Sequence, residues 1–180
     1  IIDNLKPSWR NELEITDALD NLLKQNNNIS YEKITDYWKD TGTPNDILHA
    51  NGEIIEKHPE FIKKHLTSTK NVPENVEIVG KVIMGENCSI ESNVMIEGPV
   101  IIGDNCKITA NSSLGPNVSV GNNSVISVNS IKNSIIMENC KINSTRKIRD
   151  SIVASNSEIK DNSLNDNKIF LLGEGSKISL

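Results

Sequence analysis

Hydrophobic positions recur every six residues between residues 76 and 163. Each of nine consecutive hexads opens with an aliphatic residue or a methionine, at Ile78, Met84, Ile90, Ile96, Ile102, Ile108, Leu114, Val120 and Ile126. A small or short aliphatic residue follows four positions later, at Val82, Cys88, Val94, Val100, Cys106, Ser112, Val118, Ser124 and Ser130. A period of six cannot keep one face of a helix with 3.6 residues per turn, so the pattern excludes an amphipathic helix here.

A residue suited to a tight corner stands between these two positions. Three residues after the aliphatic one it is usually asparagine, at Asn87, Asn93, Asn105, Asn111, Asn117, Asn123 and Asn129. Glycine directly follows the aliphatic residue at Gly85, Gly103, Gly115 and Gly121. Both residue types accept the unusual backbone angles of a corner. The pattern therefore predicts a β-solenoid in which each hexad is a short strand plus a corner, and in which the aliphatic and small residues point inward.

Three strands per coil would use about eighteen residues, so the repeat predicts about five coils stacked at the ~4.8 Å spacing of neighbouring strands. The register slips after Ser130 and near residues 146–150, and it resumes at Ile136, Ile142, Val153 and Ile159. One last hexad is expected at residues 172–176, after a loop.

The pattern changes along the chain and predicts three segments. Residues 1–65 lack the repeat and should be mixed and partly helical, residues 66–75 are a polar linker, and residues 76–180 form the solenoid. Within the first segment, Thr16 is expected to cap a helix that runs to about Lys24.

A second helix is predicted directly after Thr43. Thr43 is a favourable N-cap, Pro44 suits the first helical position, and Asp46 places a negative charge in the first turn. Pro59 should end this helix, because proline cannot continue the hydrogen-bonding pattern.

Composition agrees with the solenoid and narrows the function. Aromatic residues make up 3% of the chain, so the core must be aliphatic, and 25 asparagines imply many turns. The 24 acidic and 19 basic side chains give a net charge of −5, which argues against a nucleic-acid-binding protein. The sequence shows neither a membrane-spanning stretch nor a signal peptide. We therefore expect a cytoplasmic protein that binds neither nucleic acid nor a membrane.

The three cysteines are an odd number without C-x-x-C spacing, so neither a disulfide framework nor a zinc knuckle is indicated. Cys88 and Cys106 are one predicted coil apart at the inward small-residue position. We expect them to stack in the core, where a buried thiol is inert, and not to act as nucleophiles.

The repeated motif [LIV]-G-x-N-[small]-x resembles the hexapeptide repeat of left-handed parallel β-helices. This resemblance implies the same fold here. That fold occurs in acyltransferases, in some carbonic anhydrases, and as the C-terminal domain of many sugar-phosphate nucleotidyltransferases.

Two N-terminal motifs favour the last of these groups. Residues 7–18 (PSWRNELEITDA) resemble the G-E-L-E-I-T-D segment of glucose-1-phosphate thymidylyltransferases, with Asn11 in place of the usual glycine. Residues 37–44 (YWKDTGTP) resemble their W-x-D-T-G-T segment, and residues 169–174 (IFLLGE) resemble the end of their long forms. The resemblance implies a partial α/β nucleotidyltransferase segment followed by a left-handed parallel β-helix.

One family motif is missing. The nucleotide-binding site of this family opens with a G-x-G-T-R-L loop, and no such sequence occurs in the chain. We therefore expect the chain to be the C-terminal portion of a longer enzyme. By itself it should be inactive, because it lacks the nucleotide-binding half.

The chemistry that the resemblance implies is attack of glucose-1-phosphate on the α-phosphorus of dTTP, with release of pyrophosphate. Such transfers depend on positioning and on neutralising charge, with Mg²⁺ held by carboxylates and phosphates. Asp40 matches the family's metal-binding aspartate. The alternative for Asp40 is a structural one, because aspartate before Thr-Gly commonly forms a turn.

Arg10 matches the arginine that contacts the sugar phosphate, a task that suits a guanidinium. Its alternative is a surface ion pair with Glu12 or Glu14. Both glutamates are candidates for substrate binding, although only one of them can face the site from an extended strand. Trp9 and Trp38 could line a sugar site, but packing is the stronger expectation. No residue of this chain is assigned as catalytic.

Two further readings remain open at this stage, and two others lose the residue on which they depend. Acyltransferases of this fold commonly use a histidine base and the carbonic anhydrases use histidine zinc ligands, but His49, His58 and His65 all precede the repeat. A bifunctional uridylyltransferase–acetyltransferase is the alternative enzyme. The non-enzymatic reading makes the solenoid a packing module that forms a homo-oligomer.

Overall fold

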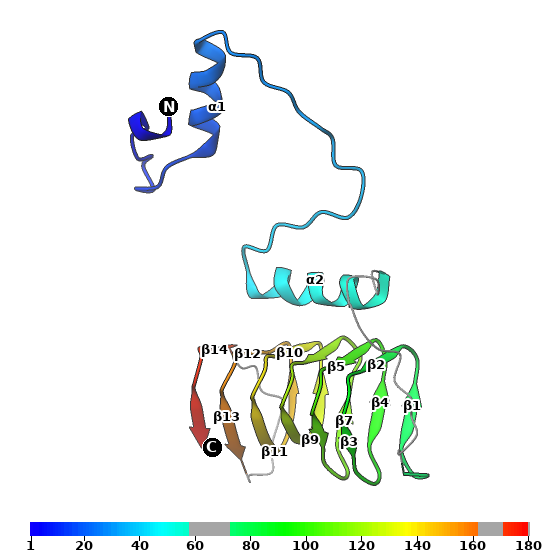
Figure 1. The fold of residues 1–180 in the computed structure, drawn as a ribbon. Coiled ribbons are helices and arrows are strands. Elements are labelled where there is room, and N and C mark those ends of the chain that lie inside the picture. Colours follow the sequence, from blue (N-terminus) through cyan, green and yellow to red (C-terminus); the bar gives the residue numbers. More distant parts are fainter. Residues whose placement is uncertain (58–72, 162–170, 180) are drawn as a thin grey trace. The chain divides into compact units, whose positions relative to one another are not determined.

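The computed structural model describes residues 1–57, 73–161 and 171–179 (Figure 1). Contacts between Cα atoms divide the chain into two compact units, Ile1–Trp38 and Lys39–Leu180. The predicted linker lies largely outside the described residues, and the predicted boundary stays a prediction. By its contacts, the second helix groups with the solenoid and not with the N-terminal unit.

The first unit contains a short 3-10 helix, η1 (Ile2–Asn4), and helix α1 (Ile15–Lys24). The helix ends where the sequence predicts, but the predicted N-cap is wrong. Thr16 lies inside the first turn, and Glu14 is the N-cap, since its carbonyl accepts the amides of Asp17 and Ala18. Among the described residues 1–57 the regular elements are helices, and no strand is present.

Helix α2 (Pro44–Lys57) begins as predicted, and Pro59, which was predicted to end it, lies outside the described residues. The Thr43 hydroxyl accepts the amide of Asp46 at 3.2 Å, and the Asp46 carboxylate accepts the amide of Thr43 at 3.1 Å. This reciprocal pair satisfies two amides at the helix start that have no partner within the helix. The N-terminus of α2 is therefore fixed by its own sequence.

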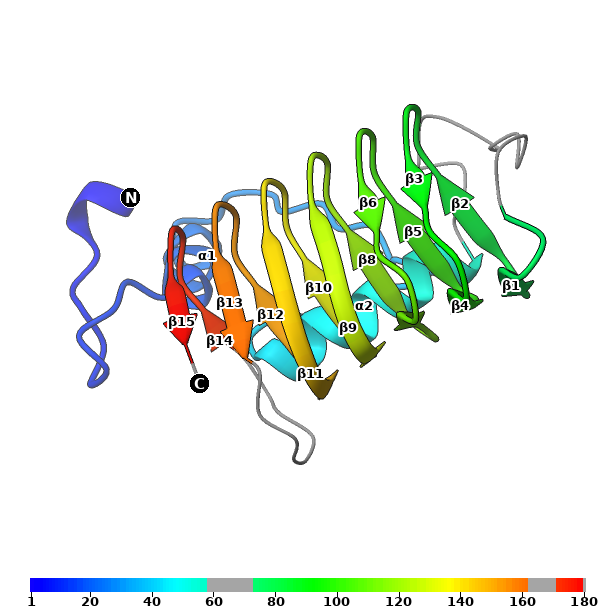
Figure 2. The ribbon, with the colours of Figure 1, turned by 90° about the horizontal axis from the view of Figure 1, so that it is seen from below.

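The described residues of the second unit form fifteen strands. Their bounds are β1 Glu77–Val79, β2 Val82–Met84, β3 Ser89–Ile90, β4 Met95–Glu97, β5 Val100–Ile102, β6 Lys107–Ile108, β7 Ser113–Leu114, β8 Val118–Val120, β9 Val125–Lys132, β10 Ser134–Ile136, β11 Lys141–Arg149, β12 Ile152–Val153, β13 Glu158–Asp161, β14 Leu171–Leu172 and β15 Lys177–Ser179. Strands of successive coils lie side by side (Figure 2). One sheet has the order β14-β12-β10-β8-β5-β2, and the other follows β1-β4-β7-β9-β11-β13-β15, with β3 and β6 joining it at β9.

All strand pairs are parallel, and in the first coils each residue pairs with the one eighteen positions later. Val82 pairs with Val100 and then with Val118, and Ile108 pairs with Ile126. This register confirms the predicted parallel β-solenoid of about five coils.

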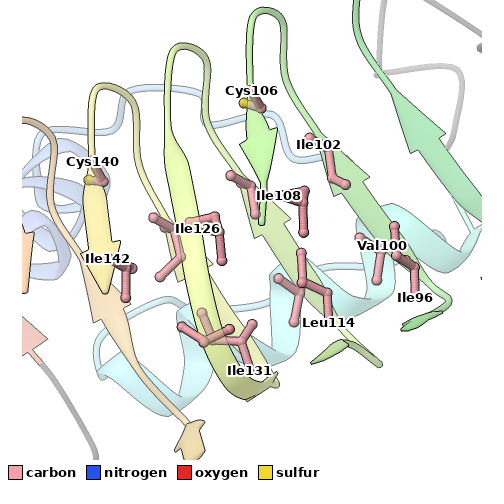
Figure 3. Close-up of a cluster of buried hydrophobic side chains, with 14 of the residues drawn as sticks. Ile96, Val100, Ile102, Cys106, Ile108, Leu114, Ile126, Ile131, Cys140 and Ile142 are labelled. Atoms are coloured by element: carbon pink, nitrogen blue, oxygen red, sulfur yellow. The ribbon is translucent and has the colours of Figure 1, made fainter. Parts of the chain in front are cut away.

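The solenoid core consists of the predicted inward positions. The aliphatic residues from Met84 to Ile126 that open the hexads are buried, and so are most of the small residues four positions later. Figure 3 shows labelled members pointing inward from successive strands, among them Ile96, Ile108, Ile126 and Ile142. Of the seven asparagines predicted at corners, six have positive φ: Asn87, Asn93, Asn105, Asn111, Asn117 and Asn123.

Asn129 is the exception. It lies inside β9, which continues to Lys132, and the corner is displaced to Asn133, where φ is 43°. Val128 and Ile131 supply the buried side chains of this longer strand, so a strand replaces the predicted corner where the hexad register slips.

The outer face of the sheet that contains β2, β5, β8, β10 and β12 carries an unusual row. Register places Ile83, Ile101, Ser119, Ile135 and Ile152 in one line across it. All five are half-buried even though they face outward from the solenoid. Helix α2 contacts this sheet at β10, and it buries its own Leu48 and Ile55.

Polar contacts between described residues also attach α2 to the solenoid. The Ser119 hydroxyl donates to Oδ1 of Asn51 at 2.5 Å, and the Lys81 ammonium donates to the carbonyl of Glu56 at 2.8 Å. Within the described part of the chain, no helix has the length and apolar character needed to cross a membrane.

Candidate functional site

The Arg10 region forms a small hydrogen-bonded cluster in the first unit. The Arg10 guanidinium donates to Oε1 of Glu14 through Nη2 at 2.7 Å and through Nε at 3.2 Å, and the Ser8 hydroxyl donates to the same oxygen at 2.9 Å. These hydrogen bonds, that of Arg10 above all, lower the pKa of Glu14 below its ordinary value. Glu14 is therefore ionised and holds the guanidinium in place.

The structure separates the two glutamates that the sequence left equivalent. Glu12 accepts the amide of Ser8 through its backbone carbonyl at 2.8 Å, and its side chain is exposed. Glu14 is the partner of Arg10, so the ion pair considered as an alternative for Arg10 is present. About half of the Arg10 side chain, 51%, stays exposed, and this fraction is available to a ligand.

Neither tryptophan packs in a core. Trp9 is 93% exposed and Trp38 is 66% exposed, so the expectation that they are packing residues is wrong. The Arg10 guanidinium carbon lies 5.9 Å from the centroid of the Trp9 ring, within the range of a cation–π contact. An exposed indole beside a guanidinium presents an apolar face next to a positive charge.

Asp40 belongs to the second unit, in an irregular segment that precedes α2, and it is exposed. Its carboxylate faces Gly42, where an added Cβ would stand 3.8 Å from Oδ1. The next acidic residue, Asp46, is engaged by the Lys39 ammonium at 2.6 Å. Asp40 thus offers a solvent-facing carboxylate, and residues 40–42 do not form the turn considered as its structural alternative.

A carboxylate of this kind fits Mg²⁺ as one of several ligands. Mg²⁺ keeps waters and takes its other ligands from substrate phosphates, so it needs only one or two protein carboxylates. The described residues contain no group of three or more histidine, cysteine or acidic side chains that could hold a metal by themselves. Asp40 would therefore supply one carboxylate ligand of such a metal.

The cysteines stack on the solenoid as predicted. Cys88 and Cys106 directly precede the paired strands β3 and β6, and the amide of Ser89 donates to the carbonyl of Cys106 at 2.9 Å. Cys106 and Cys140 are buried, and Cys88 is half-buried. A hydrogen bond from Cys106 lowers the pKa of Cys88 to about 7, and the same contact together with burial raises the pKa of Cys106. The sequence did not indicate this difference between the two thiols.

A cavity of about 400 Å³ lies between α2 and the solenoid. Its helix side is formed by His49, Gly52 and Glu53 among others, and its solenoid side by Pro99, Asn117 and Asn133. Amide and carboxylate side chains stand beside Leu48 and Pro99 in this lining, so the cavity is mixed in polarity. The sequence did not predict the cavity, because its two walls are far apart in the chain. The sequence of one wall is typical of a helix, and that of the other is typical of solenoid corners.

Comparisons with known proteins place two segments in described families. Residues 1–57 match the family described as nucleotidyl transferase, and residues 96–179 match the one described as GMPPB C-terminal domain. The two matches together extend over most of the described chain.

Several curated relatives match along nearly all of the chain. A low-salt glycan biosynthesis nucleotidyltransferase, Agl11, of Haloferax volcanii is 37% identical over 99% of this chain and 49% of its own length. A bifunctional protein GlmU of Methanococcus maripaludis is 50% identical over 94% of this chain and 40% of its own length. A glucose-1-phosphate thymidylyltransferase of Streptomyces antibioticus is 35% identical over 48% of this chain and 22% of its own length. The chain thus spans about half the length, or less, of these relatives.

Proposed function

This chain belongs to the nucleotidyltransferase family, and from that premise we propose that the protein transfers a nucleotidyl group to a sugar-1-phosphate and releases pyrophosphate. The observation that carries the proposal is the similarity to a nucleotidyltransferase over 99% of this chain. The exposed guanidinium of Arg10 and the exposed carboxylate of Asp40, both within residues 1–57, support it.

Arg10 is proposed to bind the phosphate of the sugar substrate. A guanidinium is always charged and can present two N–H groups to a phosphate. Glu14 would act as its positioning residue through the 2.7 Å ion pair, and Glu12 would contribute its exposed carboxylate to substrate binding. Nucleotidyl transfer relies on orientation and charge neutralisation, so holding the sugar phosphate in place is itself a catalytic contribution.

Asp40 is proposed as a ligand of Mg²⁺. The metal would neutralise charge on the phosphates of the nucleotide, while Asp40 would fix its position from the protein side. The exposed, solvent-facing carboxylate of Asp40 is compatible with this role. The family's G-x-G-T-R-L loop does not occur in the printed sequence, so we expect the chain alone not to turn over nucleotide.

We propose dTTP and glucose-1-phosphate as the substrates. Residues 11–17 (NELEITD) and 38–43 (WKDTGT) resemble the motifs of thymidylyltransferases, and this resemblance favours thymidylyl transfer. The test is pyrophosphate release by the intact protein with glucose-1-phosphate and either dTTP or UTP. A higher kcat/KM for dTTP is expected, and a preference for UTP would contradict the thymidylyl assignment while leaving nucleotidyl transfer intact.

The metal role is tested with Asp40→Asn in the same protein. We expect kcat/KM to fall by about 100-fold or more, because an amide holds Mg²⁺ far less well than a carboxylate. Asp36→Asn is the matched control, since Asp36 is also an exposed aspartate in the irregular segment before α2. Equal activity of the Asp40 and Asp36 variants would refute the metal role.

A second candidate is a bifunctional enzyme that also transfers an acetyl group. It is favoured by the curated relatives from methanogens that are named bifunctional protein GlmU and match 94% of this chain. Against it, the printed sequence has no histidine after His65 to serve as a base on the solenoid. Acetyl-coenzyme A turnover by the intact protein, in the presence of an amino-sugar phosphate, would establish this second activity.

The solenoid itself is proposed to be a packing module of a homo-oligomer in a cytoplasmic enzyme. The half-buried row on its outer face and the contacts of α2 with it support a packing role for the solenoid. Light scattering of the intact protein should give a mass that is a multiple of the protomer's mass. A monomer at micromolar concentration would contradict the oligomeric assignment.

A further inference from the structure

The cavity between α2 and the solenoid has no part in the proposed nucleotidyl transfer. Its volume, about 400 Å³, lies in the lower part of the range of small-molecule sites, which is about 300–1,000 Å³. Both of its walls belong to the second compact unit, whereas Arg10 belongs to the first. The cavity is therefore a separate feature of the solenoid and its helix.

Asn117 presents an unused amide to this cavity. Other corner asparagines of the solenoid bond to the neighbouring coil, as Asn87 does with Asn105 at 3.3 Å and Asn133 does with Asp150 at 2.7 Å. Asn117 has a φ of 59° as they do, but within the described part of the chain its side-chain amide makes no hydrogen bond. One donor group and one acceptor group thus face the cavity without a protein partner.

Gly52 keeps the space in front of this amide open. Glycine is unfavourable in the interior of a helix, and Gly52 lies well inside α2. A Cβ added to Gly52 would stand 3.4 Å from Oδ1 of Asn117, so packing against the solenoid does not itself demand a glycine. A larger side chain at this position would occupy the cavity.

The rest of the lining combines amides with apolar surface. Asn45 and Asn133 add amide groups, and Leu48 and Pro99 add apolar surface. An amide both donates and accepts hydrogen bonds, as a hydroxyl group does, and a small apolar surface suits the C–H face of a sugar ring. The lining therefore fits a ligand that carries several hydroxyl groups on a compact ring.

The charges of the lining exclude a phosphate. The described residues around the cavity include Glu53 and Glu56 but no lysine or arginine, and Glu53 is paired with Lys57 at 2.6 Å. A carboxylate repels an anion, and phosphate sites use guanidinium or ammonium groups. The ligand that fits is uncharged.

We propose that this cavity binds an uncharged pyranose, a sugar without a phosphate group. The Asn117 amide would bond to ring hydroxyls, and one face of the ring would pack on Pro99 and Leu48. The sugar is bound and not transformed, so no bond forms or breaks. The site does not depend on the proposed nucleotidyl transfer, for which Arg10 is proposed to hold a sugar phosphate.

The test is a titration of the full chain with the methyl α-pyranosides of glucose, mannose and galactose, followed by the amide signals in proton–nitrogen NMR. These probes carry neither a phosphate nor a free anomeric hydroxyl, so they cannot act as substrates of nucleotidyl transfer. At least one should bind with a Kd of about 1 mM, as expected for a ligand of this size, and should shift the signals of Gly52 and Asn117.

Asn117→Gly should weaken binding of that sugar by at least about tenfold, because it removes the amide while glycine accepts the positive φ. Asn139→Gly is the matched control, since Asn139 is a corner asparagine with a φ of 58° that does not line the cavity, and it should bind the sugar like the unmodified chain. Gly52→Leu should abolish binding by filling the cavity, and leucine favours the helix, so α2 should be retained.

Glu56→Gln distinguishes an uncharged sugar from a cation. It should change the Kd of the sugar by less than about threefold, because glutamine keeps the shape of glutamate and still forms hydrogen bonds. The proposal would be overturned if none of the three sugars bound at about 20 mM, far above the expected Kd. Equal Kd values for Asn117→Gly and Asn139→Gly would overturn it too, as would tighter binding of inorganic phosphate at the same signals.

Discussion

The hydroxyl of Ser119 in β8 donates a hydrogen bond to the side-chain oxygen of Asn51 in α2 over 2.5 Å, across 68 positions of the chain. This contact ties a helix that precedes the solenoid to the middle of its outer face. The neighbouring positions of the row, Ile101 and Ile135, are half-buried, so α2 acts as part of the solenoid's own packing.

The first prediction concerns this helix. Ile55 is 1% exposed and Ile54 is 40% exposed, although they are adjacent in α2. Ile55→Ala should lower the free energy of unfolding by about 2–5 kcal/mol, because it removes buried methyl groups and leaves a cavity. Ile54→Ala should change it by less than about 1 kcal/mol. Equal losses in urea denaturation would show that α2 is not docked through this face.

The second prediction concerns the corner asparagines. Asn105 has a φ of 56°, donates to Oδ1 of Asn123 at 3.1 Å and accepts from Nδ2 of Asn87 at 3.3 Å. Asn105→Ala should lower the free energy of unfolding by about 1–2 kcal/mol. Alanine adopts positive φ only at a cost, and it cannot make the hydrogen bonds to the side chains of Asn87 and Asn123.

Asn129 is the control for that substitution, because it is exposed inside β9 and is not among the residues with positive φ. Asn129→Ala should be nearly neutral. A chemical denaturation curve for each variant gives its free energy of unfolding. Similar losses of stability at the two positions would mean that the positive φ of Asn105 is not the cause of its loss.

The third prediction concerns a buried charge near the last coil. The Arg146 guanidinium pairs with the Asp161 carboxylate, whose side chain is fully buried, and Ser144 also donates to it at 3.3 Å. Arg146→Met should destabilise the fold by about 3–5 kcal/mol, because the carboxylate loses its guanidinium partner.

The double variant Arg146→Met, Asp161→Val should recover most of that loss. Strand pairing places Val128, Ser144 and Asp161 at the same inward position of three successive coils. A valine therefore already occupies this position two coils before Asp161. Thermal unfolding of the two variants tests the pair. A double variant that is no more stable than Arg146→Met would show that the lost charge partner is not the source of the damage.

The fourth prediction concerns pH. The Lys39 ammonium, together with Thr43, lowers the pKa of Asp46 below its ordinary value of 3.8. Because the folded pKa is the lower one, the stabilisation is fully present above about pH 4 and is lost as the pH falls through the folded pKa. Lys39→Met should raise the Asp46 pKa in a carbon-13 NMR titration, whereas Lys24→Met, which removes the partner of Asp20 in α1, should leave it unchanged.

Much of the solenoid could be predicted because its physics is local. A corner every six residues requires a permissive residue and an inward aliphatic, and both are visible at Asn105 and Ile108. The prediction failed at Asn129, where residue type suggested a corner but the longer strand β9 buried Val128 and Ile131 instead. Residue type alone does not reveal a change in strand length.

The candidate site could be predicted less well. The ion pair of Arg10 was foreseen, but the choice of Glu14 over Glu12 depends on backbone geometry that alternation alone does not fix. The placement of Thr16 inside α1 follows from the carbonyl of Glu14, a contact that no side-chain preference indicates. The α2 cavity depends on the docking of segments that are distant in sequence.

The coils differ in length although their core residues stay aligned. Ile108 pairs with Ile126, Ile126 with Ile142, Ile142 with Ile159, and Ile159 with Ile178, so successive coils contain eighteen, sixteen, seventeen and nineteen residues. Within the described strands, the pairing of β11 with β9 shifts its register between Ser144 and Lys147, while the stacking of the isoleucines is unchanged. Such a fold can gain or lose residues during evolution one coil at a time, without the compensating substitutions that a globular core would demand.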